Sequence, residues 1–183
     1  MKKFTIVHEI QCTPERFWEV FFDPDFNRSL YLDGLHFTDF TIVEQTPGPD
    51  IRRKVKGSPK IVLPGPIAKL IGDKFGYEEE GTFDAARGRW RWKMRPSPMG
   101  DKMRMEGELR VEPAGPGRCK RIAELEREAK VFGLGGMIEA TSEKETRGGW
   151  DGSAAYMNKW LRERGGGARA LSPARARPPA SPA

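Results

Sequence analysis

The sequence predicts an α+β domain in which a curved antiparallel β-sheet of about seven strands wraps around a long C-terminal helix, with two short helices after the first strand. Three observations lead to this fold class. Seven segments alternate apolar and polar residues, two short helical patterns directly follow the first of them, and the chain closes with a long helical segment. Because one face of an antiparallel sheet needs a cover, the closing helix is expected to pack across it.

The first three elements are a strand and two short helices. Residues 3–10 (KFTIVHEI) alternate and are predicted to form the first strand. The helix in TPERFWEVFFD begins with Thr13 at a capping position and Pro14 at the first helical position, and both residue types are favourable there. A second short helix follows in DPDFNRSLYLDG and is expected to stop at Gly34.

The remaining elements are six strands, an insert and the closing helix. FTDFTIVEQ and DIRRKVKG are predicted to form a hairpin around TPGP. The stretch from 58 to 76 (SPKIVLPGPIAKLIGDKFG) is an apolar insert broken by Pro and Gly, with a short helix expected at 66–71. Further strands are predicted at 75–84, 89–95, 102–112 and 118–131, and the closing helix at 134–163.

Composition is typical of a soluble globular protein. With 183 residues, of which 37% are hydrophobic and 32% charged, the chain is long enough for one well-buried domain. No apolar run approaches the ~20 residues of a membrane span, and MKKFTIVHEIQC alternates instead of forming an apolar leader. Cys12 and Cys119 lack CxxC spacing and are expected to be buried and reduced. These features predict a cytoplasmic protein.

The chain is predicted to divide into a domain at 1–164 and a tail at 165–183. Ala, Pro, Arg, Gly and Ser dominate the tail, and such a composition does not build a core, so the tail is expected to be disordered. Without Arg169, Arg175 and Arg177 of the tail, the net charge falls from +6 to +3. The charge of the domain itself is therefore unremarkable.

The segment GRWRWKMRP at 88–96 alternates aromatic and basic side chains, which suits either a nucleic-acid platform or a strand buried on one face. Pairing with the neighbouring strands tests these interpretations, because each register assigns every residue to a face. The predicted inward pairs are Phe83–Trp90, Gly81–Trp92 and Glu79–Met94 in the first hairpin, Met94–Met103, Trp92–Met105 and Trp90–Gly107 in the second, and Met105–Leu125, Gly107–Ala123 and Val111–Cys119 in the third.

On the outer face, the same registers place a carboxylate beside most cations. The predicted pairs are Glu80–Lys93, Glu78–Arg95, Arg91–Glu106, Arg89–Glu108, Arg104–Glu126 and Lys102–Glu128. A nucleic-acid interface needs unmatched cations, because its affinity comes from neutralising phosphates. The sequence therefore predicts an ion-paired, solvated face and no nucleic-acid partner.

The inward face combines bulky with small residues. Trp90, Trp92, Met94, Met103 and Met105 are large or flexible, while Gly81, Gly107 and Ala123 lie opposite them. One interpretation is ordinary core packing, in which a tryptophan fills the space above a glycine. The other is a pocket lined by aromatic rings and adaptable thioethers, which suits a bulky apolar ligand.

Three charged residues also point inward in these registers: Glu79, Arg121 and Arg127. Arg121 lies near a hairpin end and is expected to reach water along its aliphatic stem. Glu79 and Arg127 share the row Glu79–Met94–Met103–Arg127, which is too wide for a direct contact in a flat sheet. A charge in this row needs a partner, a hydrated pocket or a ligand head group, unless the strand ends bend and release it to solvent.

Three stretches resemble the START-like (SRPBCC) superfamily of helix-grip domains. TPERFWEVFFDPDFNRSLY resembles its capped aromatic helix and the turn into a second helix, and AKVFGLGGMIEATSEK resembles its last strand crossing glycines into the long helix. The order of elements matches over 3–163. VFGLGG and LPGPIAKLIGDKFGYEEEG most resemble a bacterial family of uncharacterised function within this superfamily.

The resemblance implies a deep apolar cavity between the sheet and the C-terminal helix that binds or carries lipids, sterols or polyketides. Some members of the superfamily are instead enzymes, such as polyketide aromatase/cyclases. The final helix departs from a regular pattern in TRGGWDGSAA, where each glycine costs about 1 kcal/mol relative to alanine. This segment is expected to kink, to open, or to leave room for a ligand beside Trp150.

Two further features bear on a site. His8 lies on the same face as Phe4, Ile6 and Ile10, so it either lines the cavity or is a satisfied core histidine, and only His36 accompanies it in the chain. Metal sites with several imidazoles are therefore not expected, and no cofactor is predicted. The apolar side chains of the insert at 59–72 form either a cap on the core or a lid that contacts a membrane surface, helped by the cations of IRRKVK and Lys60; they are Ile61, Val62, Leu63, Ile67, Leu70 and Ile71.

These features predict a protein that binds or transfers a hydrophobic small molecule and has no assigned catalytic residue. One alternative is a cyclase- or hydrolase-like enzyme using His8, Glu79, Arg127 or Tyr77, and another is an interaction module without a ligand. The predicted ligand-binding residues are Trp90, Trp92, Met94, Met103, Met105, Leu125, Arg127, Glu79, Tyr77, His8 and Trp150.

Overall fold

A single seven-stranded antiparallel sheet forms the body of the protein. The computed structural model describes residues 2–61, 64–71, 75–100, 102–133 and 135–164, so the predicted disordered tail lies outside the described residues. The strands follow one another in the order β1-β7-β6-β5-β4-β3-β2. They are β1 (Lys2–Ile10), β2 (Asp39–Gln45), β3 (Arg52–Ser58), β4 (Gly76–Asp84), β5 (Arg89–Ser97), β6 (Met103–Pro113) and β7 (Cys119–Ala129).

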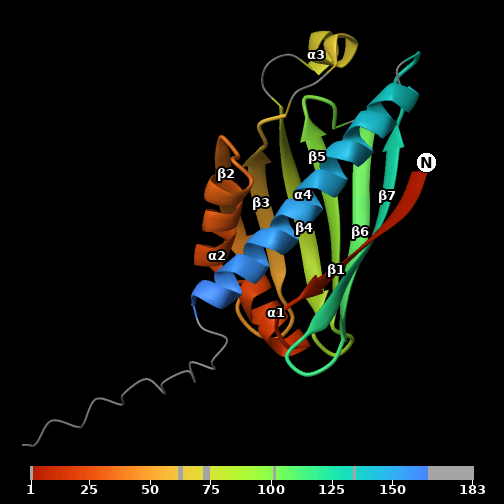
Figure 1. Ribbon diagram of the computed structural model, residues 1–183. Helices are drawn as coiled ribbons and strands as arrows, with labels where there is room; N and C mark the ends of the chain where they lie inside the picture. Colours follow the sequence, from red (N-terminus) through yellow and green to blue (C-terminus); the bar gives the residue numbers. More distant parts are fainter. Residues whose placement is uncertain (1, 62–63, 72–74, 101, 134, 165–183) are drawn as a thin grey trace, which may run out of the picture.

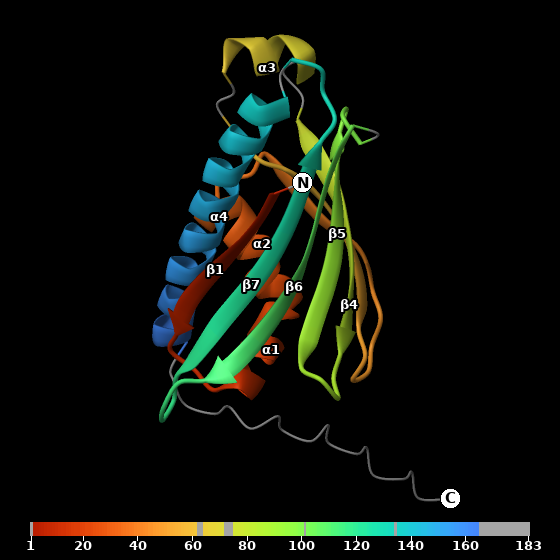
Figure 2. The same ribbon diagram turned by 90° about the vertical axis from the view of Figure 1, so that its right-hand side faces the viewer.

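The helices all pack on one side of this sheet or at its ends. α4 (Gly135–Glu163) crosses the inner face diagonally, while α1 (Pro14–Phe21) and α3 (Gly65–Ile71) lie at opposite ends of the sheet (Figures 1 and 2). The second predicted helix is divided into α2 (Pro24–Ser29) and a π-helical turn, η1 (Leu30–Gly34). The predicted α+β helix-grip architecture is therefore confirmed.

The starts of the first two helices follow from their capping residues. Thr13 Oγ1 accepts a hydrogen bond from the backbone N–H of Arg16 at 3.3 Å. Asp23 caps α2 in the same way, with its Oδ1 2.8 Å from Asp25 N and 3.0 Å from Phe26 N. Each cap satisfies N–H groups that have no partner within the helix, so the short helices form where the sequence predicts them.

The strand registers place every predicted side chain on the correct face, but two of them differ from the prediction. β4 and β5 pair as predicted, with Glu79 opposite Met94. In the next two pairs, Met94 lies opposite Met105 where Met103 was predicted, and Met105 lies opposite Arg127 where Leu125 was predicted. Both differences are shifts of two residues, which preserve the face because side chains alternate with a period of two.

The turns explain these shifts, because moving the centre of a hairpin by one residue moves its register by two. Between β5 and β6, the backbone N–H of Lys102 donates to Met99 C=O at 3.0 Å, and the pairing of Met94 with Met105 centres the hairpin one residue later than predicted. Between β6 and β7, Gly115 and Gly117 have φ values of +108° and +64°, which favour glycine and fix that turn. Turn geometry, rather than the pattern of the strands, sets the two registers.

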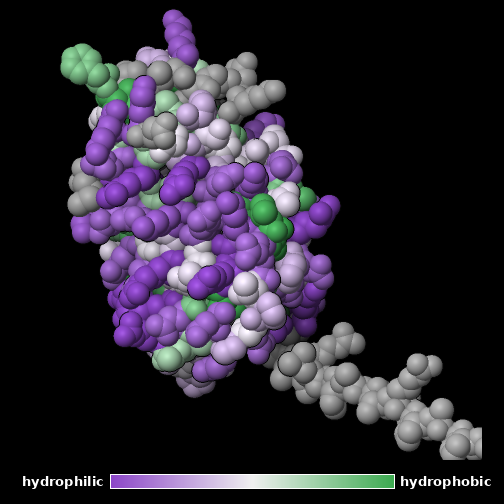
Figure 3. Space-filling model, turned by 180° about the vertical axis from the view of Figure 1, so that it is seen from behind, coloured by the Kyte–Doolittle hydropathy of each residue, from purple (hydrophilic) through white to green (hydrophobic). Residues whose placement is uncertain are grey.

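The outer face of the sheet is polar and ion-paired (Figure 3). Glu108 contacts both Arg89 and Arg91, the latter at 2.8 Å, and Lys54 Nζ lies 2.8 Å from Glu80 Oε1. The predicted matching of cations by carboxylates is therefore present, although the shifted registers exchange several partners. Arg91 pairs with Glu108 instead of Glu106, and Arg104 with Glu128 instead of Glu126. Lys93 lies opposite Glu80 as predicted, and its ion pair is with Glu106 on the other neighbouring strand.

The core is densest at the end of the sheet that α1 and α2 cover. Its cluster includes the fully buried side chains of Phe17, Phe26 and Leu109, each of which removes its apolar surface from water. Cys12 and Cys119 are buried there as free thiols, and their mutual hydrogen bond together with burial raises the pKa of Cys12. In the described part of the chain, no helix has the length and hydropathy required to cross a membrane.

Tryptophans pack against glycines on the inner face of the sheet. A Cβ atom at Gly81 would overlap the ring of Trp90, and one at Gly107 would lie 2.8 Å from both Trp92 Cζ2 and the backbone oxygen of Glu124. Both tryptophans are nearly inaccessible to solvent, so their rings have little space into which to move. The two glycines are therefore required for the rings to lie flat on the sheet.

Substituting Gly81 with alanine is expected to lower the free energy of unfolding by about 1–3 kcal/mol, because the added methyl group displaces a buried ring. Urea unfolding followed by tryptophan fluorescence measures this loss. Thr82→Ser, an exposed position on the same strand, is the control and should change stability much less. Equal effects of the two substitutions would show that the contact with Trp90 does not constrain residue 81.

Candidate functional site

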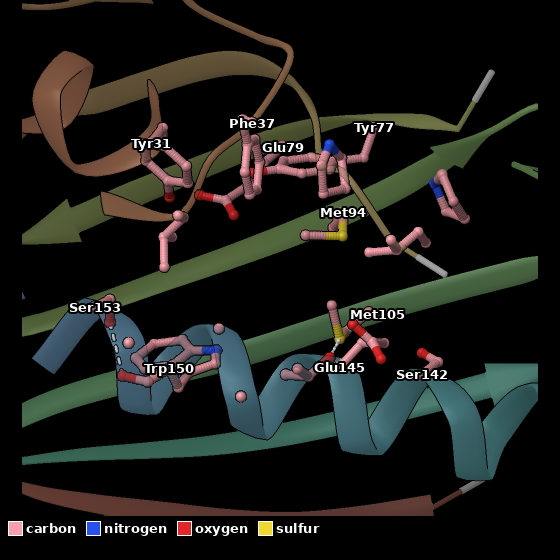
Figure 4. Close-up of a pocket in the computed structure, with 18 of the residues that line it drawn as sticks. Tyr31, Phe37, Tyr77, Glu79, Met94, Met105, Ser142, Glu145, Trp150 and Ser153 are labelled. Atoms are coloured by element: carbon pink, nitrogen blue, oxygen red, sulfur yellow. Dashed lines mark hydrogen bonds between the residues drawn. The ribbon is translucent and has the colours of Figure 1, made fainter. Parts of the chain in front are cut away.

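A cavity of about 540 Å³ lies between the inner face of the sheet and α4 (Figure 4). Its walls carry many aromatic side chains and come from α1, α2, η1, the strands β3 to β7 and α4. Methionines of β5 and β6 lie between these walls. The aromatic and thioether lining comprises Phe21, Phe26, Tyr31, Phe37, Phe75, Tyr77, Trp90, Trp92, Trp150, Met94, Met103, Met105 and Met157.

Nine of the eleven predicted ligand-binding residues border this cavity. Leu125 does not, because it is 1% exposed and packs in the core cluster. His8 does not line it either, and instead contacts a lining residue from behind. The nine that border the cavity are Trp90, Trp92, Met94, Met103, Met105, Arg127, Glu79, Tyr77 and Trp150.

The two tryptophans of β5 belong to the core and to the wall at once. Trp90 packs edge-on against Phe21 and Phe22, with ring centroids 5.9 Å and 5.4 Å away, while part of its ring borders the cavity. Trp92 is 5% exposed and also borders it. Trp90 and Trp92 therefore pack in the core and line the cavity at the same time.

Arg127 is one of three buried arginines in the lining and is 2% exposed. Its Nη2 donates to Thr146 Oγ1 at 2.6 Å and lies 3.1 Å from Met105 Sδ, while Nη1 donates to the backbone oxygen of Glu139 at 3.3 Å. Burial lowers the pKa of Arg127 to about 10. Arg127 shares a row with Glu79, as predicted, although Met105 rather than Met103 lies between them.

Arg121 does not reach water, which corrects the expectation from its place near a hairpin end. It is 3% exposed, because α4 covers it. Its guanidinium donates to Ser153 Oγ at 2.8 Å, to the backbone oxygen of Trp150 at 2.8 Å and to His8 Nδ1 at 2.9 Å. It also lies 4.8 Å from the centroid of the Trp150 ring. Burial lowers its pKa to about 10.

His8 links Arg121 to a surface carboxylate. Its Nδ1 accepts from Arg121, since arginine only donates, and so Nε2 carries the proton that is donated to Asp151 Oδ1 at 2.7 Å. Desolvation is the largest influence on this imidazole and lowers its pKa, while the hydrogen bond to Asp151 opposes the shift. The neutral imidazole of His8 therefore holds the guanidinium of Arg121 in place. His36 is exposed and takes no part.

A third arginine, Arg53, lies in the cavity wall beside Glu79 and was not predicted there. It is 5% exposed, and its Nη1 donates to the backbone oxygen of Phe21 at 3.0 Å. Its guanidinium lies 4.7 Å from the ring centroid of Phe21 and 4.9 Å from that of Trp90. The sequence could have placed Arg53 on the inner face, because it lies two residues before the inward-facing Val55 on the same strand.

Glu79 and two tyrosines form the polar part of the opposite wall (Figure 4). Burial raises the pKa of Glu79, and the nearby charge of Arg53 opposes this shift. Burial also raises the pKa of Tyr31 to about 12 and that of Tyr77 well above its ordinary value. Glu79 and Tyr31 are partly buried, Tyr77 and Arg53 are buried, and the carboxyl group of Glu79 holds a proton more readily than one on the surface.

The glycines of α4 leave space beside Trp150. The helix continues without interruption through TRGGWDGSAA, so this segment neither breaks nor unwinds. Gly148 and Gly149 line the cavity, and a Cβ atom on either would have nothing within 4 Å. Gly152 differs, because its Cβ would lie 3.0 Å from Leu35. Of the three interpretations of this segment, room in the cavity is the one that the geometry fits.

The cavity opens to solvent beside α4 and below the insert, because exposed residues take part in its lining. They are Lys60, Arg104, Glu145 and Gly148. Ile67 of the insert is 2% exposed and packs with Met99 and Ile138, so this part of the insert acts as a cap. Val62 and Leu63 lie outside the described residues, as do the side chains of Leu70 and Ile71.

No metal site is apparent among the side chains that the structure describes, since no three His, Cys, Asp or Glu residues cluster there. The groups available in the interior of the cavity are apolar side chains, three buried guanidinium groups, the carboxyl group of Glu79 and several hydroxyl groups.

The chain belongs to a family described as a protein of unknown function, DUF2505, whose sequence profile matches residues 5–161. No curated protein matches the chain in sequence. The expected membership of an uncharacterised family with a START-like fold is thus confirmed.

Solved structures similar to this chain share its fold at low sequence identity. The ZhuI aromatase/cyclase from Streptomyces sp. R1128 superposes with a TM-score of 0.64 at 14% identity, covering 89% of this chain and 94% of that one. A norcoclaurine synthase from Thalictrum flavum, in complex with dopamine and hydroxybenzaldehyde, gives 0.62 at 16% identity, with 90% and 88% covered. A START superfamily protein from Mycobacterium smegmatis gives 0.58 at 12% identity, with 89% and 99% covered.

The bond from Arg121 to His8 predicts a pH-dependent component of stability. Because the pKa of His8 is lowered from 6.5, its neutral form stabilises the fold fully above about pH 6.5, and this contribution is lost as the pH falls through the lowered pKa. His8→Gln removes it, so the urea midpoint of the wild type should fall more between pH 7.5 and pH 5.5 than that of the variant. His36→Gln is the control and should behave like the wild type. An identical fall in all three proteins would contradict the prediction.

Proposed function

We propose that this protein binds or carries a hydrophobic small molecule in the cavity between the sheet and α4. The observation that carries the proposal is the open space in front of Gly149, in a cavity that many aromatic rings line. A volume of about 540 Å³ is within the range of small-molecule sites. The mixture of many apolar and few polar groups is also typical of such sites.

The glycines of α4 support this proposal over an interaction module without a ligand. Each glycine in the middle of a helix costs stability relative to alanine, and alanine would fit at both positions. A domain that only needed a stable core would gain from filling this space. The glycines therefore make sense if the space is used by another molecule.

The similar structures support an aromatic or polycyclic ligand in particular. One of them is an aromatase/cyclase, and another is a synthase in complex with dopamine and hydroxybenzaldehyde. The cavity of this chain has the side chains that stack on such compounds, including Tyr31, Phe37 and Trp150 (Figure 4). We infer a ligand with at least one ring, held by the aromatic walls and the adaptable Met94 and Met105.

An enzyme acting on such a ligand is the second candidate, and Glu79 favours it. Its carboxyl group borders the cavity, its pKa is raised by burial, and Tyr31 and Tyr77 lie beside it. A carboxyl group with a raised pKa is suited to general acid–base chemistry, such as the proton transfers of a cyclisation. Arg53 counteracts the shift, which also fits a purely structural charge pair, so binding without turnover is the leading proposal.

Binding is tested with N-phenyl-1-naphthylamine, a neutral apolar dye that fluoresces in hydrophobic sites. Gly149→Leu is expected to weaken its binding at least tenfold by filling the cavity, while thermal stability is unchanged or higher because leucine is the better helix former. Gly136→Leu is the matched control, because Gly136 lies on the same helix outside the cavity lining and also has free space. Equal dye binding by the two variants, or no dye binding by the wild type, would contradict the proposal.

Catalysis is tested on the natural ligand, recovered by native mass spectrometry of the protein purified from its source. Under the second candidate, incubation of this compound with the wild type changes its mass or its chromatographic behaviour, and Glu79→Gln abolishes the change while retaining binding. Asp84→Gln, a carboxylate position outside the cavity lining, is the control and should leave turnover intact. Conversion by Glu79→Gln at the wild-type rate would remove Glu79 from the reaction.

A further inference from the structure

The charges that line the cavity are unbalanced. Three arginines, Arg53, Arg121 and Arg127, are at least nine-tenths buried and take part in the lining. The carboxyl groups of the lining are those of Glu79 and the exposed Glu145. Burial of a cation without a counter-charge is costly, so the interior favours a molecule that brings negative charge with it.

Two of the three arginines, Arg53 and Arg121, already contact neighbouring groups that partly offset their charge. Arg53 is stacked against Phe21 and Trp90 and interacts with the charge of Glu79. Arg121 is held by Ser153 and by His8, which connects it to the carboxylate of Asp151. Each of these guanidinium groups therefore has a neighbour that compensates part of its charge.

Arg127 differs from the other two because one of its N–H groups faces a thioether instead of an oxygen, a ring or an imidazole. Like Arg53 and Arg121, it has a buried Nε without a hydrogen-bond partner in the part of the chain that the structure describes, and it forms no ion pair with a carboxylate of the described residues, since Glu143 and Glu139 act on its charge only from a greater distance. Of its five N–H groups, one is directed at Met105 Sδ at 3.1 Å. A thioether is a weak acceptor, and a methionine side chain changes its conformation readily. An anion would therefore be a much better partner for this guanidinium than Met105 is.

The surroundings of Arg127 complete a site for an acidic group. Thr146, which accepts from Arg127 at 2.6 Å, also lines the cavity, and its hydroxyl group is free to donate to a ligand because it holds only a long 3.9 Å contact to Met105. From Arg127 the row continues over Met105 and Met94 towards Glu79. An acidic group at Arg127 would thus leave an apolar body lying over the two methionines and facing the aromatic wall.

We propose that the ligand is an amphipathic anion, whose carboxylate, sulfonate or phosphate-ester group pairs with Arg127 and whose apolar body fills the aromatic cavity. This inference rests on the proposed function and specifies the chemical class of the ligand. The acidic group takes the N–H that now faces Met105 and the unpartnered Nε–H, in the side-by-side geometry that guanidinium and oxyanions favour. Met105 moves aside, and Thr146 adds a hydrogen bond.

The test compares two dyes that share one ring system and differ in charge. 1-Anilinonaphthalene-8-sulfonate carries a sulfonate, and N-phenyl-1-naphthylamine is the same scaffold without it. The wild type is expected to bind the sulfonate dye at least tenfold more tightly than the neutral dye, with one site per chain. Arg127→Met should remove this preference and leave binding of the neutral dye within about threefold of the wild type. Arg127→Lys keeps the charge and should keep part of the preference.

Arg95→Gln is the matched control, because it removes one exposed positive charge from the same sheet outside the cavity lining. It should leave the preference for the sulfonate dye unchanged. Equal affinity of the wild type for both dyes, or equal loss in Arg95→Gln and Arg127→Met, would overturn the inference while leaving the proposed function intact. Failure of both dyes to bind would overturn the proposed function itself.

Competition with dodecanoate, dodecyl phosphate and dodecanol then identifies the acidic group. Displacement of the neutral dye by dodecanoate alone assigns a carboxylate, and displacement by dodecyl phosphate alone assigns a phosphate ester. Displacement by dodecanol with the same affinity as the two acids would contradict a role for charge.

Discussion

One helix has to cover a sheet that is much wider than itself, and most features of this molecule follow from that mismatch. Seven strands at a spacing of about 4.8 Å span almost 30 Å, whereas a helix with its side chains is about 10–12 Å across. The sheet curves around α4, and α1, α2, η1 and α3 close the two ends (Figures 1 and 2). The space that remains in the middle is either filled by large side chains or left as a cavity.

The chain does both, at different places along the sheet. Near α1, the rings of Trp90 and Phe17 fill the interior, and Gly81 allows the tryptophan to lie against the strands. Towards α3 the interior is hollow, and the residues there are adaptable or polar. Arg127 belongs to this hollow part, where its hydrogen bond to Thr146 of α4 replaces part of the water that the guanidinium loses. Charge and empty space therefore occur together, which is typical of a site rather than of a core.

The sequence was sufficient for the architecture and for the side of the sheet on which each residue lies, because alternation fixes the face independently of the register. It was insufficient for the register of two hairpins, since the geometry at Met99 and Gly115 decided where those turns are centred. Even so, Glu79 and Arg127 fall in the predicted row, because the two shifts cancel across β5 and β6. The resemblance implied the cavity between the sheet and the C-terminal helix, but the contributions of η1 and Arg53 to its lining needed the structure, because these residues meet α4 from distant parts of the chain.

At its glycines, α4 is helical although glycine has a low helix propensity. Such disagreements between local propensity and the overall fold tend to mark functional sites. α4 is anchored near its start by Ile138 and near its end by Met157 and Leu161, all buried. Between these anchors, Gly148 and Gly149 give the helix no side chains with which to hold the sheet, and they bring its bare backbone to the cavity. A helix gripped firmly at both ends tolerates this loss in the middle without breaking. The middle of α4 is thus free to serve as the wall against which a ligand packs.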